Sequence, residues 1–198
     1  MYIFVFMWTP KLEPLFPGLP HGQVFACFMT CSALGSGLLK YIAAYRGPAL
    51  IYMREVYGIA ALCLVLPSIP GIGGPMTVAC FFLFEVIVGI YWPSMGGIKA
   101  QHVPEEVRAT IYNIFRIPLN LIVLLVLSNI GTISDDSVFM VCALLLAAAA
   151  FMQHLFIGMV QSQSSHSMGP AHAATEDLAP LTRPPASDDI DSEIQPAR

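Results

Sequence analysis

The stretch EEVRATIYNIFRIPLNLIVLLVLSNI, residues 105–130, decides the fold class because it is mostly apolar and long enough to cross a bilayer. An α-helix needs about 20 predominantly apolar residues for that. Arg116 lies inside the stretch, and a guanidinium keeps its charge, so burying it in hydrocarbon is costly. The stretch therefore predicts a membrane-spanning helix whose Arg116 faces an aqueous cavity rather than lipid.

The rest of the chain is similarly apolar. Of its 198 residues, 56% are hydrophobic and 11% are charged, whereas soluble domains carry about 25% charged residues. Apolar segments of sufficient length recur along the chain, and the expected membrane spans are about 22–45, 50–69, 75–98, 109–131 and 137–159. The sequence predicts an all-α polytopic membrane protein.

The two ends differ from these spans. Residues 1–8, MYIFVFMW, are apolar but too short to cross a bilayer, so we interpret them as the stub of a transmembrane helix whose beginning is absent. Residues 160–198 are rich in serine, proline, alanine and acids. That composition predicts a disordered tail.

Basic residues are concentrated in alternate connections. The basic connections hold Lys40, Arg46, Arg54, Lys99 and Arg108, whereas the others hold Lys11 with Glu13, no charge, and Asp135 with Asp136. The positive-inside rule places the basic connections in the cytoplasm, and the tail with them. The sequence offers no basic surface for nucleic acid.

Three polar side chains share one face of the 109–131 span. Asn113 and Asn120 lie three residues before and four residues after Arg116. A fixed positive charge beside amide donors suits an oxyanion, so we predict that Arg116, Asn113 and Asn120 bind substrate. The alternative is a structural arginine whose guanidinium reaches back to the membrane interface.

Glu85 lies near the middle of the 75–98 span, about 15 Å from its nearer edge. A carboxyl group at that depth is a functional candidate by default, so proton coupling is one interpretation. The other is a structural, protonated carboxyl group that hydrogen-bonds within the bundle. Gly89 and Gly96 fall on the same face and indicate a close helix contact.

Two further features concern helix shape and packing. Pro93 and Pro118 each lie inside a span, remove a backbone hydrogen bond and predict a helix bend. In the 22–45 span a stripe of small residues predicts the contact with a neighbouring helix: Ala26, Thr30, Ala33 and Gly37.

The sequence does not favour an enzyme. The spans contain no nucleophile with a neighbouring base and no paired aspartates. The five cysteines and five histidines lack ligand spacing, so we expect neither a metal site nor a cofactor.

Three segments carry a family resemblance: FVFMWTPKLEP, FMTCSALGSGLL and GIYWPSMGGIKAQHVPEEVRATIYNIFRIPLNL. Their order resembles the C-terminal half of the molybdate-anion transporter family within the major facilitator superfamily, over roughly residues 1–131. The resemblance implies the C-terminal six-helix half of a twelve-helix carrier, with its first helix truncated. It also implies alternating access, molybdate as substrate, a lipid bilayer (the plasma membrane) as surroundings, and an N-terminal half absent from this chain.

One segment departs from the superfamily pattern. The connection LLKYIAAYRGP lacks the acidic residue of the usual gating loop, so the latch on that side has no assigned residue. Two other functions stay open: a carrier of another solute on the same fold, and a non-transporting membrane fragment or scaffold.

Overall fold

The computed structural model describes residues 1–129 and 132–176, and side chains as far as residue 163. In this part of the chain it contains six α-helices and one short 3-10 helix: α1 (Tyr2–Leu12), α2 (His21–Arg46), α3 (Ala49–Val65), η1 (Leu66–Ser68), α4 (Gly74–His102), α5 (Glu105–Ser128) and α6 (Asp135–Glu176). Contacts divide the chain into Met1–Ile157 and Gly158–Arg198. The first unit holds the helix bundle, and the second continues α6 to Glu176.

Among the described residues, five helical segments are long and apolar enough to cross a membrane: α2, α3 with η1, α4, α5 and the first part of α6. This confirms the predicted all-α polytopic fold. Prolines stand where helices begin, because their fixed φ suits the first turn: Pro20, Pro48, Pro75 and Pro104. At the end of α2, Gly47 has a φ of 84°, a conformation that favours glycine.

The helices exceed the sequence prediction at both ends of the chain. α1 continues to Leu12, beyond the stub expected over residues 1–8, because Pro10 removes one backbone bond without stopping the helix. The Glu13 N–H still donates to the Thr9 carbonyl at 2.9 Å.

α6 likewise runs through residues 160–176, where we expected the disordered tail to begin. This stretch holds glutamine, methionine and alanine, which favour a helix, but also four serines, Gly169 and Pro170, which do not, so helix propensity alone does not explain how far α6 continues. The rest of the predicted tail, residues 177–198, lies outside the described residues.

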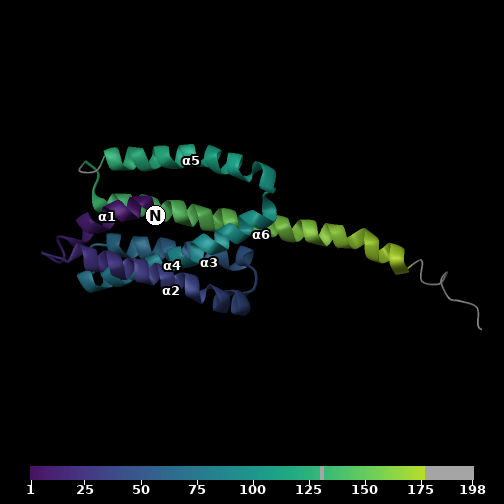
Figure 1. Cartoon of the computed structure of the whole chain (residues 1–198), viewed down its shortest axis with the longest axis horizontal. Helices are drawn as coiled ribbons and strands as arrows, with labels where there is room; N and C mark the ends of the chain where they lie inside the picture. Colours follow the sequence, from purple (N-terminus) through teal and green to yellow (C-terminus); the bar gives the residue numbers. More distant parts are fainter. Residues whose placement is uncertain (130–131, 177–198) are drawn as a thin grey trace, which may run out of the picture. The chain divides into compact units, whose positions relative to one another are not determined.

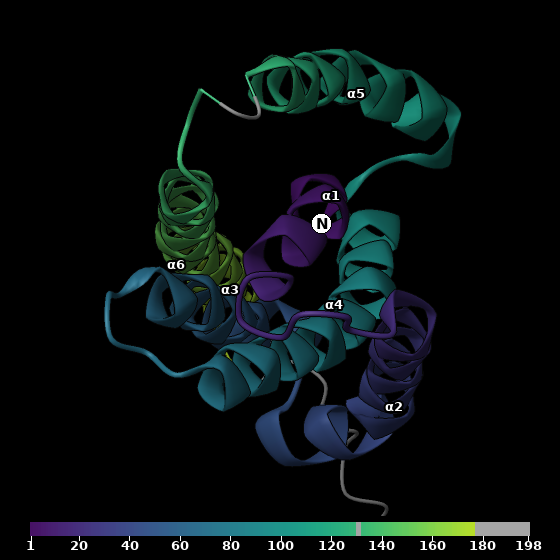
Figure 2. The same cartoon turned by 90° about the vertical axis from the view of Figure 1, so that its left-hand side faces the viewer.

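Within Met1–Ile157 the long helices run side by side with roughly parallel axes (Figure 1). An end-on view shows α1 in the middle, with α4, α5 and α6 around it (Figure 2). The core lies where α1 meets α2 and α4. The Phe4 ring packs against Phe28, Phe81 and Phe84 at centroid distances of 5.8, 5.1 and 4.7 Å. Such tilted and edge-on pairs are favourable arrangements of aromatic rings.

α2 and α4 approach each other at two glycines. A Cβ atom on Gly35 would lie 2.0 Å from the Val86 carbonyl oxygen, and one on Gly89 would lie 2.0 Å from the Ser32 carbonyl oxygen. Only glycine allows backbones to come this close. The close contact expected at Gly89 is therefore present, whereas nothing lies within 4 Å of a Cβ on Gly96.

The small-residue stripe predicted on α2 does not form this contact. All four of its residues are exposed within the described chain: Ala26, Thr30, Ala33 and Gly37. The reason is that α2 carries small residues on several faces, so size alone does not identify the packing face. Phe28 and Gly35 are the buried residues of α2.

α5 packs least against the rest of the bundle. None of its residues is buried, whereas α4 has eleven buried residues. Figure 2 shows it at the edge of the bundle, beyond α1. Most of its surface is therefore available to lipid, water or another protein.

Charged residues gather at the two ends of the bundle. We call one the acidic end, where α1 stops and α6 starts; its charged residues are Lys11, Glu13, Asp135 and Asp136. We call the other the basic end, where α2 stops and α3 starts; its basic residues are Lys40, Arg46, Arg54, Lys99 and Arg108. The alternate connections of the sequence thus meet at opposite ends.

Candidate substrate-binding face

A cavity of about 360 Å³ lies among α1, α3, α4, α5 and α6 within the first unit. Its lining is almost wholly apolar and includes Phe4, Tyr57, Tyr91, Trp92, Leu119 and Phe139. Apolar cavities of this size take apolar groups readily, but they do not stabilise an unpaired dianion. A charged substrate therefore needs polar groups from the cavity's border.

Such groups lie on α5. We call Asn113, Arg116 and Asn120 the polar stripe; all three are exposed, and none forms a hydrogen bond or ion pair with another described residue. Val123, seven residues after Arg116, lines the cavity, and residues seven apart share a helix face. The polar stripe consequently runs beside the cavity-lining side of α5.

Glu85 lies on α4 and, unlike the polar stripe, is buried. Its side chain is 1% exposed, and its Oε2 atom has no hydrogen-bond partner among the described residues. It follows Phe81 and Phe84, which pack against Phe4 of α1. Within the described chain no ion pair joins Glu85 to Arg116, so the structure does not unite the predicted substrate-binding residues with the predicted proton site.

Pro93 has a role that sequence analysis missed. α4 continues through it as a helix, and because proline has no N–H, the Gly89 carbonyl loses its donor within the helix. The Ser36 hydroxyl of α2 donates to that carbonyl at 2.9 Å. The proline thus exposes an acceptor at the glycine contact, and the neighbouring helix uses it.

A second polar contact involves Ser94, the residue after Pro93. The buried Ser94 hydroxyl donates to the Ile90 carbonyl at 2.7 Å, and the Tyr52 hydroxyl of α3 lies 2.8 Å from the same serine oxygen. Because the Ser94 hydroxyl proton is used in the bond to Ile90, the Tyr52 hydroxyl donates to the Ser94 oxygen. Together these bonds join α4 to α2 and α3 on both sides of Pro93, in a region where unsatisfied polar groups are expensive.

Pro118 shows the contrasting case. α5 also continues through this proline, and the Ile114 carbonyl loses its donor in the same way. No hydrogen bond from another described side chain reaches it. The bends expected at Pro93 and Pro118 stay predictions, because both helices are continuous.

The basic end is held by several side-chain contacts between helices. Arg46 of α2 pairs with Glu55 of α3 at 3.1 Å, and Arg54 lies 3.2 Å from the Nδ1 atom of His154 on α6. Gln153 donates to the Leu50 carbonyl at 2.8 Å. α3 is therefore tied to both α2 and α6 at this end.

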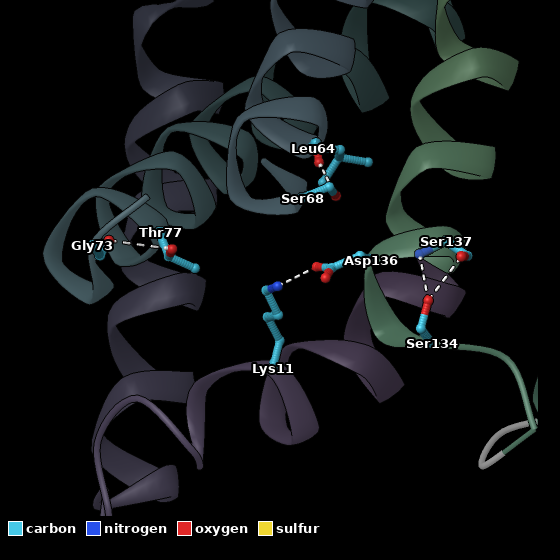
Figure 3. Close-up of polar contacts among 8 residues, drawn as sticks. All are labelled: Lys11, Leu64, Ser68, Gly73, Thr77, Ser134, Asp136 and Ser137. Carbon is cyan, nitrogen blue, oxygen red and sulfur yellow. Dashed lines mark hydrogen bonds and ion pairs between the residues drawn. The ribbon is translucent and has the colours of Figure 1, made fainter. Parts of the chain in front are cut away.

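The acidic end has fewer contacts. Lys11 of α1 forms an ion pair with Asp136 of α6, as Figure 3 shows. Ser134 precedes α6, and its hydroxyl oxygen lies 2.8 Å from that of Ser137 and 3.4 Å from the Ser137 backbone nitrogen. At the start of α2, the Nε2 atom of His21 lies 2.7 Å from a carboxylate oxygen of Glu13. The described residues include no group of three histidine, cysteine or acidic side chains that could hold a metal ion.

Comparison with known proteins gives two kinds of match. A family model described as sugar transporters with 12 transmembrane segments matches residues 1–84. Proteins named molybdate-anion transporter are similar over longer stretches. The one from Takifugu rubripes is 34% identical over 62% of this chain, that from Danio rerio 35% over 62%, and that from Xenopus tropicalis 30% over 83%.

The chain is much shorter than these relatives. The matched part spans 26% of the Takifugu rubripes and Danio rerio proteins and 38% of the Xenopus tropicalis protein. No solved structure matches the chain significantly.

Proposed function

Because the chain belongs to the molybdate-anion transporter family of the major facilitator superfamily, we propose that it supplies the C-terminal half of a carrier that moves molybdate across a membrane. The relatives' names, their greater length and the five membrane-length helices support this proposal. The carrier works by alternating access between two halves, and the N-terminal half lies outside residues 1–198. In such carriers the substrate binds near the bilayer midplane, between the halves.

One observation carries the proposal: the polar stripe lies on a helix with no buried residue, beside an apolar cavity. A guanidinium and two amides cannot face hydrocarbon at low cost, so they need water or protein on that side. The N-terminal half covers α5 and encloses a wet passage there. The passage is thereby bordered by the polar stripe and backed by the cavity.

The polar stripe has the right chemistry for a tetrahedral oxyanion. Molybdate carries two negative charges and only hydrogen-bond acceptors. Arg116 offers a planar set of donors that can hold two oxygens at once, and the amides of Asn113 and Asn120 add neutral donors. The apolar lining of the cavity lowers the dielectric constant on one side of the passage, which strengthens these interactions.

Glu85 is the residue we propose for proton coupling. Its carboxyl group is buried in the middle of α4, and one of its oxygens has no hydrogen-bond partner among the described residues, which makes this acid a candidate for carrying a proton. When the passage on its side admits water, the carboxyl group can release that proton. The alternative is a purely structural Glu85 whose protonated carboxyl group hydrogen-bonds within the bundle.

The direct test is molybdate uptake by the complete carrier, containing this chain and its N-terminal half. We expect Arg116→Ala to reduce uptake at least tenfold and Arg116→Lys to retain part of it, because lysine keeps the charge but loses the bidentate donors. The matched control is Arg46→Gln, an exposed cation at the basic end, which should leave uptake unchanged. Unchanged import by Arg116→Ala would show that the site assignment is wrong.

Labelling gives an independent test of the passage. Single cysteines at positions 113, 116 and 120, in a carrier without its native cysteines, should react with a water-soluble thiol reagent, and molybdate should slow the reaction. A cysteine at Leu121, an exposed apolar position of α5, is the control for lipid-facing residues. If all three positions are sealed against the reagent, the passage does not run along the polar stripe.

A second function is favoured by the sugar-transporter model that matches residues 1–84. In that case the same fold carries an uncharged solute. Competition separates the two, since sulfate and tungstate should inhibit an oxyanion carrier, and sugars should inhibit the alternative. A chain that forms a stable assembly without transporting either class would instead be a membrane scaffold.

The orientation is also a proposal. The basic end faces the cytoplasm by the positive-inside rule, which places the C-terminal tail there and the acidic end outside, at the plasma membrane. Glycosylation sites introduced next to Glu13 and next to Arg46 would test this. Only the first should be glycosylated.

A further inference from the structure

Lys11 is the only lysine or arginine that the described residues place at the acidic end. Its nitrogen pairs with a carboxylate oxygen of Asp136, which connects α1 to α6 across 125 positions of sequence. Figure 3 shows the Lys11 side chain pointing away from α1 toward Asp136. The single fixed cation at this end therefore already holds an anionic group.

Each partner is stabilised by its own helix. Lys11 lies in the last turn of α1, and Asp136 lies in the first turn of α6. A cation is favoured at a helix C-terminus and an anion at an N-terminus. Each helix end therefore favours the charge that it carries, whether or not the two side chains are in contact.

The two side chains differ in how firmly they are held. The Lys11 side chain is 17% exposed, whereas that of Asp136 is 54% exposed. Trp8 and Leu12, the neighbours of Lys11 on α1, are buried, so the aliphatic part of the lysine side chain is fixed against the bundle. Asp136 is short and half in solvent, and it can turn outward. The cation is the stationary member of the pair, and the carboxylate is the displaceable one.

We propose that Lys11 is a recruiting site for the incoming oxyanion at the acidic end, and that Asp136 occupies this site until the substrate displaces it. The inference rests on the proposed transport function and adds a second substrate contact, far along the chain from the polar stripe. Displacement also breaks the described ion pair between α1 and α6. Arrival of the anion thereby loosens the acidic end.

The surroundings make a fixed cation necessary. The other charged residues at this end are the three carboxylates of Glu13, Asp135 and Asp136, so no diffuse positive field attracts an anion. Glu13 is in contact with His21 at 2.7 Å. An oxyanion is therefore selected by close contact with the Lys11 ammonium, at the partly desolvated position that Asp136 now fills.

The test measures the KM and maximal rate of molybdate uptake by the complete carrier, with the substrate supplied from the acidic-end side. Lys11→Gln should raise KM about tenfold, and Lys11→Arg should stay within about twofold of wild type, since it keeps the charge. Asp136→Asn should lower KM about threefold, because a neutral amide competes less well for the lysine.

The double variant Lys11→Gln/Asp136→Asn decides between recruitment and simple clamping. It removes both charges, so neither charge is left without its partner. If the ion pair only holds α1 and α6 together, its loss should not change KM. Recruitment predicts that KM stays about tenfold above wild type with the maximal rate kept, and that KM for molybdate supplied from the basic-end side does not change. The control pair is Arg46→Gln/Glu55→Gln at the basic end, which should not alter KM.

The outcomes are distinguishable. A wild-type KM in the double variant overturns this inference and leaves the transport proposal intact. Absence of molybdate uptake by the wild-type carrier overturns the transport proposal and this inference with it. If Lys11→Gln alone fails to reach the membrane, the double variant and Lys11→Arg still give the answer.

Discussion

The contact between α2 and α4 allows a quantitative prediction for Gly89→Ala. The added Cβ would lie 2.0 Å from the Ser32 carbonyl oxygen and 2.8 Å from its carbon. Carbon and oxygen atoms approach to about 3.3 Å even in close contacts. The obstacle is backbone on a helix rather than the end of a flexible side chain, so the two helices must separate by about 1 Å.

That separation has two costs. Overpacking of a tight contact typically destabilises by about 1–3 kcal/mol. The hydrogen bond from Ser36 to the Gly89 carbonyl, 2.9 Å long, is stretched at the same time, which adds about 1 kcal/mol. The total is about 2–4 kcal/mol, and for a unit of this size it corresponds to a fall in Tm of about 5–15 °C.

The assay is thermal unfolding of the purified carrier in detergent, followed by intrinsic fluorescence. Gly97→Ala is the matched control, because it lies in the same helix and a Cβ there meets nothing within 4 Å. It should be neutral or slightly stabilising, as alanine is a better helix former than glycine. Equal Tm values for the two variants would refute the reasoning about the close contact.

Three substitutions at polar side chains test the contacts of α4 and the role of Glu85. Tyr52→Phe should lower Tm by about 2–4 °C, because it removes one buried hydrogen bond worth about 1 kcal/mol; an unchanged Tm would show that the bond contributes nothing. Ser36→Ala should lower the free energy of unfolding by about 1 kcal/mol in the wild type. In a Pro93→Ala background it should lower it by almost nothing, because the new N–H of residue 93 donates to the Gly89 carbonyl instead. Additive effects in the double-mutant cycle would contradict this. Glu85→Gln should unfold at or above the wild-type temperature, since its oxygen has no partner in the described chain, yet should abolish stimulation of uptake by a proton gradient; retained stimulation would leave Glu85 a structural residue.

The membrane fold was predictable because few backbone conformations are stable in the hydrocarbon of a bilayer. A bilayer forces backbone polar groups to bond within their own segment, so a run of apolar residues about 20 long is enough to expect a helix. The expected spans begin and end within a few residues of the observed helices, except that α6 continues past the apolar run. Where apolarity was the only signal, as at Leu12 and beyond residue 159, the sequence did not reveal how far the helix continues.

Packing between helices was less predictable. Small residues occur on more than one face of α2, so the sequence favoured the stripe at Ala26 and Gly37 while the structure uses Gly35. The Ser36 contact joins residues 53 positions apart, and no local pattern announces it. The sequence does show that Pro93 lies inside a helix and leaves a carbonyl without its donor. It does not show which serine of a neighbouring helix donates to that carbonyl.

The candidate site was predictable only in its residue types. Polar groups inside an apolar span stand out, which identified Arg116 and Glu85. Their partners were not predictable, because within the described chain neither side chain has one. The roles of both residues, and of Asn113 and Asn120, stay predictions that the uptake and labelling experiments address.

The exposed surface of α5 has a consequence for local stability. A helix with no buried residue gains little free energy from packing against its own bundle. We therefore expect the backbone amides of α5 to exchange with deuterium earlier than those of α4, which has eleven buried residues. A protein surface that covers α5 should slow this exchange.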